Sequence, residues 1–265
     1  MQPSAALIPV PRQGHKERES RGPGVLRRIG FACLAVLGLA GCAGAPGGQA
    51  GGDPGDPDEA ANRKIFAFDQ MLDRQFLLPT AQRYNRYVPE FGRDRIHYLL
   101  VNLDLPVTFA NEVLQGEPKQ AGQTFARFGI NAVFGLGLFD PATSQFRLPE
   151  HQEDFGQTLG VWGMGDDPYL MLPGLGPSSL RDVTGRIVDI GFDPMVWISF
   201  KQHIWWWAGR QYFKVLDARA RNIDTLEGIE RSSVDFYAAT RSLYRQYRSN
   251  EIRNGEPAKG DLPDL

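Results

Sequence analysis

Apolar residues recur at helical spacing in several segments of the chain, and proline or glycine residues separate these segments. In residues 62–78, four apolar side chains fall on one helical face: Ile65, Phe68, Leu72 and Phe76. This predicted helix ends at Pro79, and similar patterns predict helices over residues 80–88, 93–103, 107–115, 118–133, 178–190 and 224–249. Ser178 or Ser179 is placed to cap the helix over residues 178–190, and Asp224 begins a capping box for the last helix. We therefore expect an all-α body of amphipathic helices.

Residues 135–177 break this pattern, because 13 of these 43 positions are Gly or Pro. We expect little regular structure there, and long loops of this kind are often functional. The segment still carries large apolar residues, among them Phe139, Trp162, Met164 and Tyr169. A loop of this composition either packs inward or contacts something apolar.

Aromatic residues concentrate in residues 192–213, where Trp197 precedes the run Trp205, Trp206 and Trp207. Successive helical positions lie about 100° apart, so three adjacent Trp side chains cover most of a helix circumference. Core packing is one explanation of this run. We favour a membrane–water interface, where the apolar ring and the polar N–H group of Trp are both satisfied.

The N-terminus has the pattern of an export signal. Arg27 and Arg28 precede an apolar run at residues 29–39, which is too short to span a bilayer. The run ends in Leu39-Ala40-Gly41-Cys42, which resembles the bacterial lipobox, although an ordinary secretory signal with a chance Cys is the alternative. We predict a signal peptide at residues 1–41 and an acylated Cys42 that anchors the mature chain to a membrane.

The rest of the chain divides into three parts. Residues 42–58 follow the signal, are rich in Gly, Pro and Asp after the lipidated Cys, and contain no large apolar side chain, so we expect a flexible tether. A helical domain is expected at residues 59–250 and a disordered tail at 251–265. Ala43 follows the Cys, rather than the Asp that commonly retains lipoproteins at the inner membrane, so we expect the outer membrane.

Charge and residue types argue against several functions. Residues 43–265 carry 23 basic and 29 acidic side chains, and this mildly acidic balance disfavours nucleic-acid binding. No segment after the signal has 18 uninterrupted apolar residues, so we predict no transmembrane helix. The three histidines of the mature chain lack metal-ligand spacing, and His151, beside acidic residues, is interpreted as part of a solvated loop. Ser178 and Ser179 do not lie in a G-x-S-x-G motif. We therefore expect no catalytic residues, no cofactor and no metal.

A series of ordered motifs runs along the body. They include Asn62-Arg63-x-Ile65-Phe66-x-Phe68, Tyr87-Val88-Pro89, Gly135-x-Gly137-Leu138-Phe139-Asp140 and, as the most specific, Asp154-Phe155-Gly156-Gln157-Thr158-Leu159-Gly160-Val161-Trp162-Gly163. Together with the lipobox, these motifs resemble the MlaA (VacJ) family of outer-membrane lipoproteins, over about residues 59–194.

The resemblance implies a ring-like single domain of amphipathic helices, embedded in the inner, periplasm-facing leaflet of the outer membrane, with an amphipathic channel. It implies that the protein removes mislocalised glycerophospholipids from the outer leaflet and passes them to a periplasmic carrier similar to MlaC, often in complex with a trimeric porin. With it in view, we place the lipid path at Phe139, Phe155, Trp162, Gly163, Met164, Gly165 and Tyr169, and the membrane interface at Trp197, Trp205, Trp206 and Trp207.

Some residues depart from the family pattern. Asp69 stands where the family usually has Asn, and Asp167-Pro168-Tyr169 stands for Gly-Pro-Tyr. Two other functions remain as alternatives: a structural lipoprotein that binds an envelope protein without moving lipid, and a lipid hydrolase.

Overall fold

A computed structural model describes residues 53–165, 168–197 and 203–256 of the chain. The first helical path has three parts: α2 (Glu59–Leu72), the π-helical turn η1 (Asp73–Leu77) and α3 (Leu78–Tyr87). Pro79 lies in the first turn of α3, so the prediction that it ends a helix is wrong. A proline ring clashes with the carbonyl group four residues earlier in a regular helix, and the wider π turn before Pro79 relieves that clash.

The next two helices, α4 (Glu90–Gln115) and α5 (Pro118–Val133), pack against each other. α4 joins two segments that were predicted as separate helices, because it continues through Pro106. Arg210 donates a hydrogen bond of 3.0 Å to the carbonyl oxygen of Leu103, one turn before this proline. The left-handed Gly116, with a φ of 78°, ends α4 as predicted.

The Gly/Pro-rich region contains more regular structure than its composition predicts. The short helices α6 (Pro141–Ser144) and α7 (Phe155–Val161) precede an antiparallel hairpin of β1 (Tyr169–Leu172) and β2 (Gly176–Ser179). This hairpin departs from the all-α expectation, and Gly174 in its turn has a φ of 72°. The hydroxyl group of Ser179 accepts a hydrogen bond from the backbone N–H of Asp182 and caps α8 (Leu180–Phe192), as predicted.

The described chain ends in the helices α9 (Pro194–Trp197), α10 (His203–Arg221), α11 (Ile223–Ser232) and α12 (Phe236–Ile252). The single helix predicted over residues 224–249 is therefore two helices. Asp235 begins the second, because its carboxylate accepts a hydrogen bond of 3.1 Å from the backbone N–H of Ala238. Asp224 lies inside the first turn of α11 and is not its cap.

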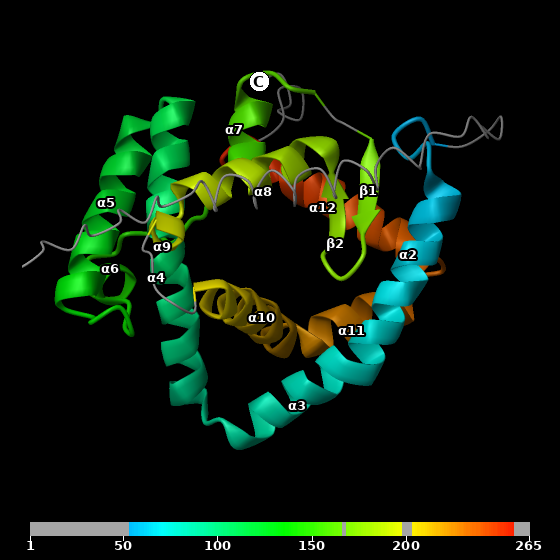
Figure 1. The fold of residues 1–265 in the computed structure, drawn as a ribbon, viewed down its shortest axis with the longest axis horizontal. Helices are drawn as coiled ribbons and strands as arrows, with labels where there is room; N and C mark the ends of the chain where they lie inside the picture. Colours follow the sequence, from blue (N-terminus) through cyan, green and yellow to red (C-terminus); the bar gives the residue numbers. More distant parts are fainter. Residues whose placement is uncertain (1–52, 166–167, 198–202, 257–265) are drawn as a thin grey trace, which may run out of the picture. The chain divides into compact units, whose positions relative to one another are not determined.

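Packing contacts connect these elements into a closed circuit within the body (Figure 1). α3 packs against α10, α10 against α4, and α4 against α8. From α8 the circuit continues through the β hairpin to α2, while α12 packs against α7 and α11. The prediction of a mostly helical single domain is confirmed.

Residues 53–58, predicted as the end of a flexible tether, belong to this body. The Asp56 carboxylate is buried and accepts hydrogen bonds from Asn62 (2.8 Å), Arg241 (2.7 Å) and Tyr237. The carbonyl oxygen of Gly55 accepts a hydrogen bond of 2.8 Å from the backbone N–H of Tyr169. Composition favoured a solvated segment, but charge-assisted hydrogen bonds to α12 hold it in place.

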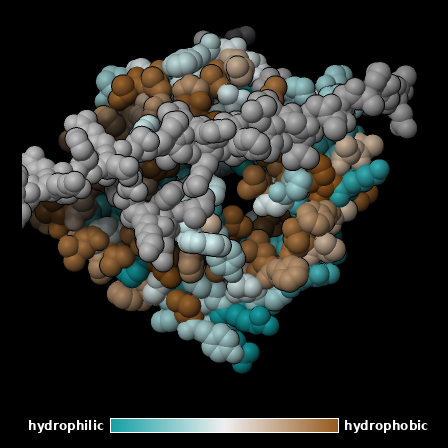
Figure 2. Space-filling model, viewed as in Figure 1, coloured by the Kyte–Doolittle hydropathy of each residue, from teal (hydrophilic) through white to brown (hydrophobic). Residues whose placement is uncertain are grey.

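Polar side chains dominate the interior, and many large apolar side chains lie outside. Among the described residues, 20 polar or charged residues are buried against 12 apolar ones, while 34 large apolar residues are exposed. Figure 2 shows apolar residues, in brown, gathered at several places on the surface of the body. In most globular domains charged residues are rarely fully buried and apolar residues fill the core, so this distribution is unusual.

Candidate functional site

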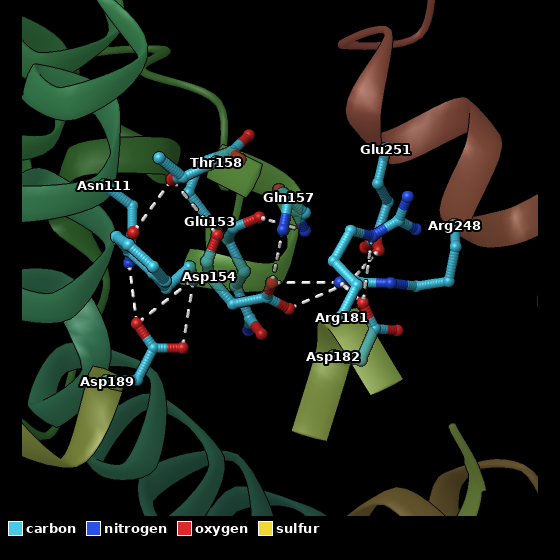
Figure 3. Close-up of polar contacts among 12 residues, drawn as sticks. Asn111, Glu153, Asp154, Gln157, Thr158, Arg181, Asp182, Asp189, Arg248 and Glu251 are labelled. Carbon is cyan, nitrogen blue, oxygen red and sulfur yellow. Dashed lines mark hydrogen bonds and ion pairs between the residues drawn. The ribbon is translucent and has the colours of Figure 1, made fainter. Parts of the chain in front are cut away.

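The most specific motif, residues 154–163, begins where α7, α8 and α12 meet (Figure 3). Asp154 caps α7, because its carboxylate accepts a hydrogen bond of 2.8 Å from the backbone N–H of Gln157. The same carboxylate accepts two hydrogen bonds, of 2.8 and 2.9 Å, from Arg248 of α12. Arg248 also donates to Asp182 at 2.8 Å and to Glu251 at 2.9 Å. One buried guanidinium group thus joins segments that are far apart in the sequence.

The acidic groups of this polar network ionise at different pH values. Burial opposes the ionisation of Asp182, but the charge and the hydrogen bond of Arg248 keep its pKa below the ordinary value of 3.8. Burial raises the pKa of Asp189 to about 6, although Asn111 donates a hydrogen bond of 2.9 Å to it. Burial also raises the pKa of Glu153 to about 7. Part of the network therefore changes its charge near neutral pH.

We had expected His151 to lie in a solvated loop, but the structure holds its side chain against the body. Its imidazole ring is partly buried and forms a hydrogen bond with Glu112 of α4, which raises the pKa of His151. Glu112 is fully buried and also accepts a hydrogen bond of 2.8 Å from the hydroxyl group of Thr124 in α5. A buried carboxylate needs such partners, and it therefore holds the histidine against the body.

Two glycines allow α7 and α8 to cross in direct backbone contact. A Cβ atom on Gly185 would lie 2.3 Å from the backbone nitrogen of Gly156. A Cβ atom on Gly156 would lie 2.7 Å from a carboxylate oxygen of Asp182. Gly156 therefore belongs to the motif because the two helices approach closely, a reason that the sequence alone did not reveal.

Phe155 and Trp162, two of the residues predicted on the lipid path, contact each other at the two ends of α7. Their ring centroids lie 5.8 Å apart in an edge-on arrangement. The indole N–H of Trp162 donates a hydrogen bond of 3.1 Å to the carbonyl oxygen of Leu114 in α4, and most of the ring remains exposed. The structure thus presents an apolar ring whose polar atom is already satisfied.

The next three predicted residues form an exposed segment directly after Trp162. Gly163 has a φ of 96°, a conformation that favours glycine. Arg181 of α8 donates hydrogen bonds to the carbonyl oxygens of Met164 at 3.2 Å and Gly165 at 3.4 Å. Residues 163–165 are therefore held to α8 through their backbone, while the Met164 side chain is exposed.

The remaining two predicted residues lie elsewhere. Tyr169 is 1% exposed and packs with Met171 and Tyr237 in one of two small apolar clusters. Side chains alternate along β1, and this alternation turns Tyr169 inward, so it belongs to the core and not to a lipid-facing surface. Phe139 is exposed, contacts Phe91 with ring centroids 6.3 Å apart, and lies under the guanidinium group of Arg95.

The four tryptophans predicted at a membrane interface are all exposed. The exposed fraction is 74% for Trp197, 76% for Trp205, 46% for Trp206 and 38% for Trp207. Packing in the core of the protein is therefore not the explanation of this aromatic run. Cys42, the predicted lipidation site, lies outside the described residues.

Sequence reasoning missed the buried arginines of the body, both Arg248 in the polar network and others outside it. Arg248 lies within the last predicted helix, and neither it nor Arg127 or Arg210 was predicted to be buried. Arg127 forms an ion pair with Asp140 at 3.1 Å, and Asp140 ends the motif Gly135-x-Gly137-Leu138-Phe139-Asp140. A charged residue inside an otherwise apolar motif was the available signal.

Neither a metal site nor a membrane-spanning helix is present in the described part of the chain. In residues 53–165, 168–197 and 203–256, no three His, Cys, Asp or Glu side chains are arranged to hold a metal ion. Within the same ranges, no helix has the length and apolar composition needed to cross a bilayer. What the site offers is a fixed polar network beside exposed apolar side chains, a combination that suits binding of an amphipathic molecule.

Comparison with known proteins extends this result. A family model described as "MlaA lipoprotein" matches residues 54–251. The "Intermembrane phospholipid transport system lipoprotein MlaA" of Haemophilus influenzae is 34% identical over 218 residues, covering 78% of this chain and 83% of the relative. The protein of the same name from Escherichia coli K12 is 33% identical over 208 residues, covering 76% and 79%. A solved structure described by "Structural basis for maintenance of bacterial outer membrane lipid asymmetry" is 34% identical, with a TM-score of 0.67 over 74% of this chain and 98% of that chain. The chain therefore belongs to the MlaA lipoprotein family.

Proposed function

We propose that this protein removes mislocalised glycerophospholipids from the outer leaflet of the outer membrane and passes them to a periplasmic carrier similar to MlaC. Its role would be to maintain the lipid asymmetry of that membrane without catalysing a reaction. Support comes from relatives that cover most of the chain and are named for intermembrane phospholipid transport. A trimeric porin is the expected partner in the membrane.

The observation that carries this proposal is the distribution of polar and apolar side chains. The described residues include 34 exposed large apolar residues and 20 buried polar ones, a distribution that suits an environment of acyl chains around the body. Because the described helices include none that could span a bilayer, we propose that the body is embedded in the inner, periplasm-facing leaflet alone. The exposed Trp197 and Trp205 would then lie at the boundary between headgroups and acyl chains.

We place the lipid path, an amphipathic channel, beside the exposed residues of the motif region. Phe155, Trp162 and Met164 would supply an apolar wall, and the backbone around Gly163 and Gly165 would supply polar groups. Phe139 would lie on a separate stretch of the same path. A phospholipid needs both kinds of surface, because its headgroup and its acyl chains cannot share one environment.

The experiment that tests the function is lipid transfer between two purified proteins. The full-length lipoprotein, reconstituted in vesicles with a fluorescent glycerophospholipid, is mixed with a lipid-free carrier of the MlaC type. We expect labelled lipid to appear on the carrier at a rate that depends on the lipoprotein. A carrier that binds the lipoprotein but receives no lipid would instead support a structural role, and release of fatty acid would support a hydrolase.

Anchoring through Cys42 is a separate part of the proposal. Three acyl chains on one residue would hold the chain at the membrane, since each buried methylene contributes about 0.8 kcal/mol. Cys42→Ala is expected to preserve the fold, measured on the purified body, and to lower the amount of protein in outer-membrane fractions. If the variant is located and functions as the wild type does, the aromatic helices rather than the lipid anchor the protein.

A further inference from the structure

A cavity of about 440 Å³ lies between α4 and the segment that follows α5. Arg95 and Tyr98 of α4 line one side, and Phe134, Phe139 and Gln145 line the other. Pockets that bind small molecules have volumes of about 300–1,000 Å³. The cavity shares no residue with the polar network of Figure 3.

Arg95 differs from the buried arginines of the network in having no anionic partner. Its guanidinium carbon lies 4.1 Å from the ring centroid of Phe139, 4.7 Å from that of Phe91 and 5.1 Å from that of Tyr98. In the described part of the chain its side chain forms no ion pair. Its buried Nε atom also lacks a hydrogen-bond acceptor, a feature that it shares with Arg127, Arg210 and Arg248. Arg248, by contrast, binds three carboxylates. Three aromatic rings thus orient a cation whose hydrogen-bond donors are free.

Asp140 also lines the cavity, but its charge is already compensated. Its carboxylate accepts hydrogen bonds from Asn131 at 2.9 Å and from Arg127 at 3.1 Å. Burial opposes its ionisation, yet these groups and Thr143 keep the pKa of Asp140 below 3.8. The uncompensated charge at this cavity is therefore the positive one of Arg95.

We propose that Arg95 binds the phosphate group of a glycerophospholipid in this cavity. A guanidinium group presents parallel N–H donors that match two phosphate oxygens, and the hydroxyl group of Tyr98 lies among the lining groups as a further donor. The exposed rings of Phe134 and Phe139 provide an apolar rim for the glycerol and the first acyl carbons. This inference rests on the proposed function and names the group that recognises the substrate.

An amphipathic ligand fits this cavity better than a free anion or an acidic protein segment. Phe134 is 72% exposed, so its ring needs an apolar contact that inorganic phosphate cannot give. Cation–π contacts on several sides also reduce the hydration of the guanidinium group, which strengthens its hydrogen bonds to an anion. Charge and apolar surface therefore meet at one place, as they do in a phospholipid.

The test measures binding of soluble short-chain lipids to the full-length protein in detergent by calorimetry. Dihexanoylphosphatidylglycerol carries the phosphate, and dihexanoylglycerol lacks it. We expect Arg95→Met to weaken binding of the phospholipid by about 10- to 100-fold, the effect of losing a charge-assisted hydrogen-bonded pair, and to leave binding of dihexanoylglycerol nearly unchanged. Arg86→Met is the matched control, because Arg86 stacks on Tyr87 at 5.7 Å but is exposed and outside the cavity.

Gln145→Glu provides a variant that does not depend on the packing of Arg95. Gln145 is an exposed lining residue, so the substitution should preserve the fold, and its new charge should weaken phospholipid binding in a salt-dependent way. The inference is overturned if Arg95→Met binds the phospholipid as the wild type does, or if it loses both lipids equally. Inorganic phosphate that binds as tightly as the phospholipid would also overturn it. Each of these results concerns the Arg95 site alone: the proposed function still stands if the wild type transfers lipid to the carrier. That function is refuted only if the wild type fails to transfer lipid.

Discussion

The crossing of α7 and α8 offers a sharp test of the structure, because Gly185 has no room for a Cβ atom. Gly185→Ala would place that atom 2.3 Å from the backbone nitrogen of Gly156 and 2.7 Å from its Cα atom, where ordinary contacts begin at 3.4 Å. Backbone atoms cannot rotate away as a side chain does. The two helices must therefore separate by about 1 Å, a shift that a close-packed crossing resists.

The cost follows from the contacts that this separation strains. Overpacking of this kind costs about 1–3 kcal/mol, and weakening the partly buried hydrogen bond from the Phe155 N–H to Asp189 (3.1 Å) costs about 1 kcal/mol more. The higher helix propensity of Ala offsets about 1 kcal/mol. We expect a net loss of about 1–3 kcal/mol, which lowers the Tm by about 2–12 °C in a domain of this size.

Gly191→Ala is the matched control in the same helix, because a Cβ atom there meets no atom within 4 Å. Its Tm should be unchanged or slightly raised, since Ala is the better helix former. Far-ultraviolet circular dichroism of both variants in detergent gives the two values. Equal melting of Gly185→Ala and the wild type would refute the proposed backbone contact between α7 and α8.

Three further predictions concern the polar network and the aromatic surface. Arg248→Met should destabilise the body by about 3–5 kcal/mol in denaturant unfolding, because the buried Asp182 would keep only Arg181, at 3.6 Å, as a charged partner. Adding Asp182→Asn should recover part of that loss. The pKa of Glu153 is raised from 4.5 to about 7, so the folded state holds this proton more tightly and the stability of the protein falls as the pH rises from about 4.5 through 7. Glu153→Gln should flatten this decline in Tm values measured across that pH range. A decline that is the same in the variant would contradict the raised pKa of Glu153. Trp205→Ser should lower binding to phospholipid vesicles without changing the Tm, whereas unchanged vesicle binding would remove Trp205 from the membrane surface.

The sequence predicts those elements whose signals are local. α5 and α8 are recognisable because apolar periodicity, a proline in the first turn of one and a serine cap on the other lie within the segments themselves. Pro79 and Pro106 mislead for the opposite reason. Both prolines are tolerated inside helical paths, the first beside a π turn and the second beside a hydrogen bond from the distant Arg210.

The β hairpin and the site depend on contacts that no local pattern carries. Asn62 donates to the carbonyl oxygen of Tyr169 at 3.0 Å, and Asp69 accepts from the backbone N–H of Gly174 at 2.7 Å. An Asn at position 69 would offer the same acceptor, so the departure from the family pattern keeps this contact. The residues predicted on the lipid path also do not share one surface, because the pairing of β1 with β2 turns Tyr169 inward while Trp162 stays exposed.

The arginine network explains how such a body keeps its shape in the environment that we propose. When the exterior contacts acyl chains, burying an apolar side chain inside the protein gains little, because the lipid is as apolar as a protein core. Directional contacts must then specify which helices meet. Arg127, Arg210 and Arg248 each bind carboxylates from other segments, at 3.1 Å for the Arg127–Asp140 pair and at 2.8 Å for the nearest contacts of Arg248. Losing one partner of such a pair in a medium of low polarity leaves an unpaired charge, so a misassembled circuit is strongly disfavoured. The same contacts hold α7 so that the ring of Trp162, directly after this helix, is exposed, and the polar interior and the apolar exterior are therefore two consequences of one arrangement.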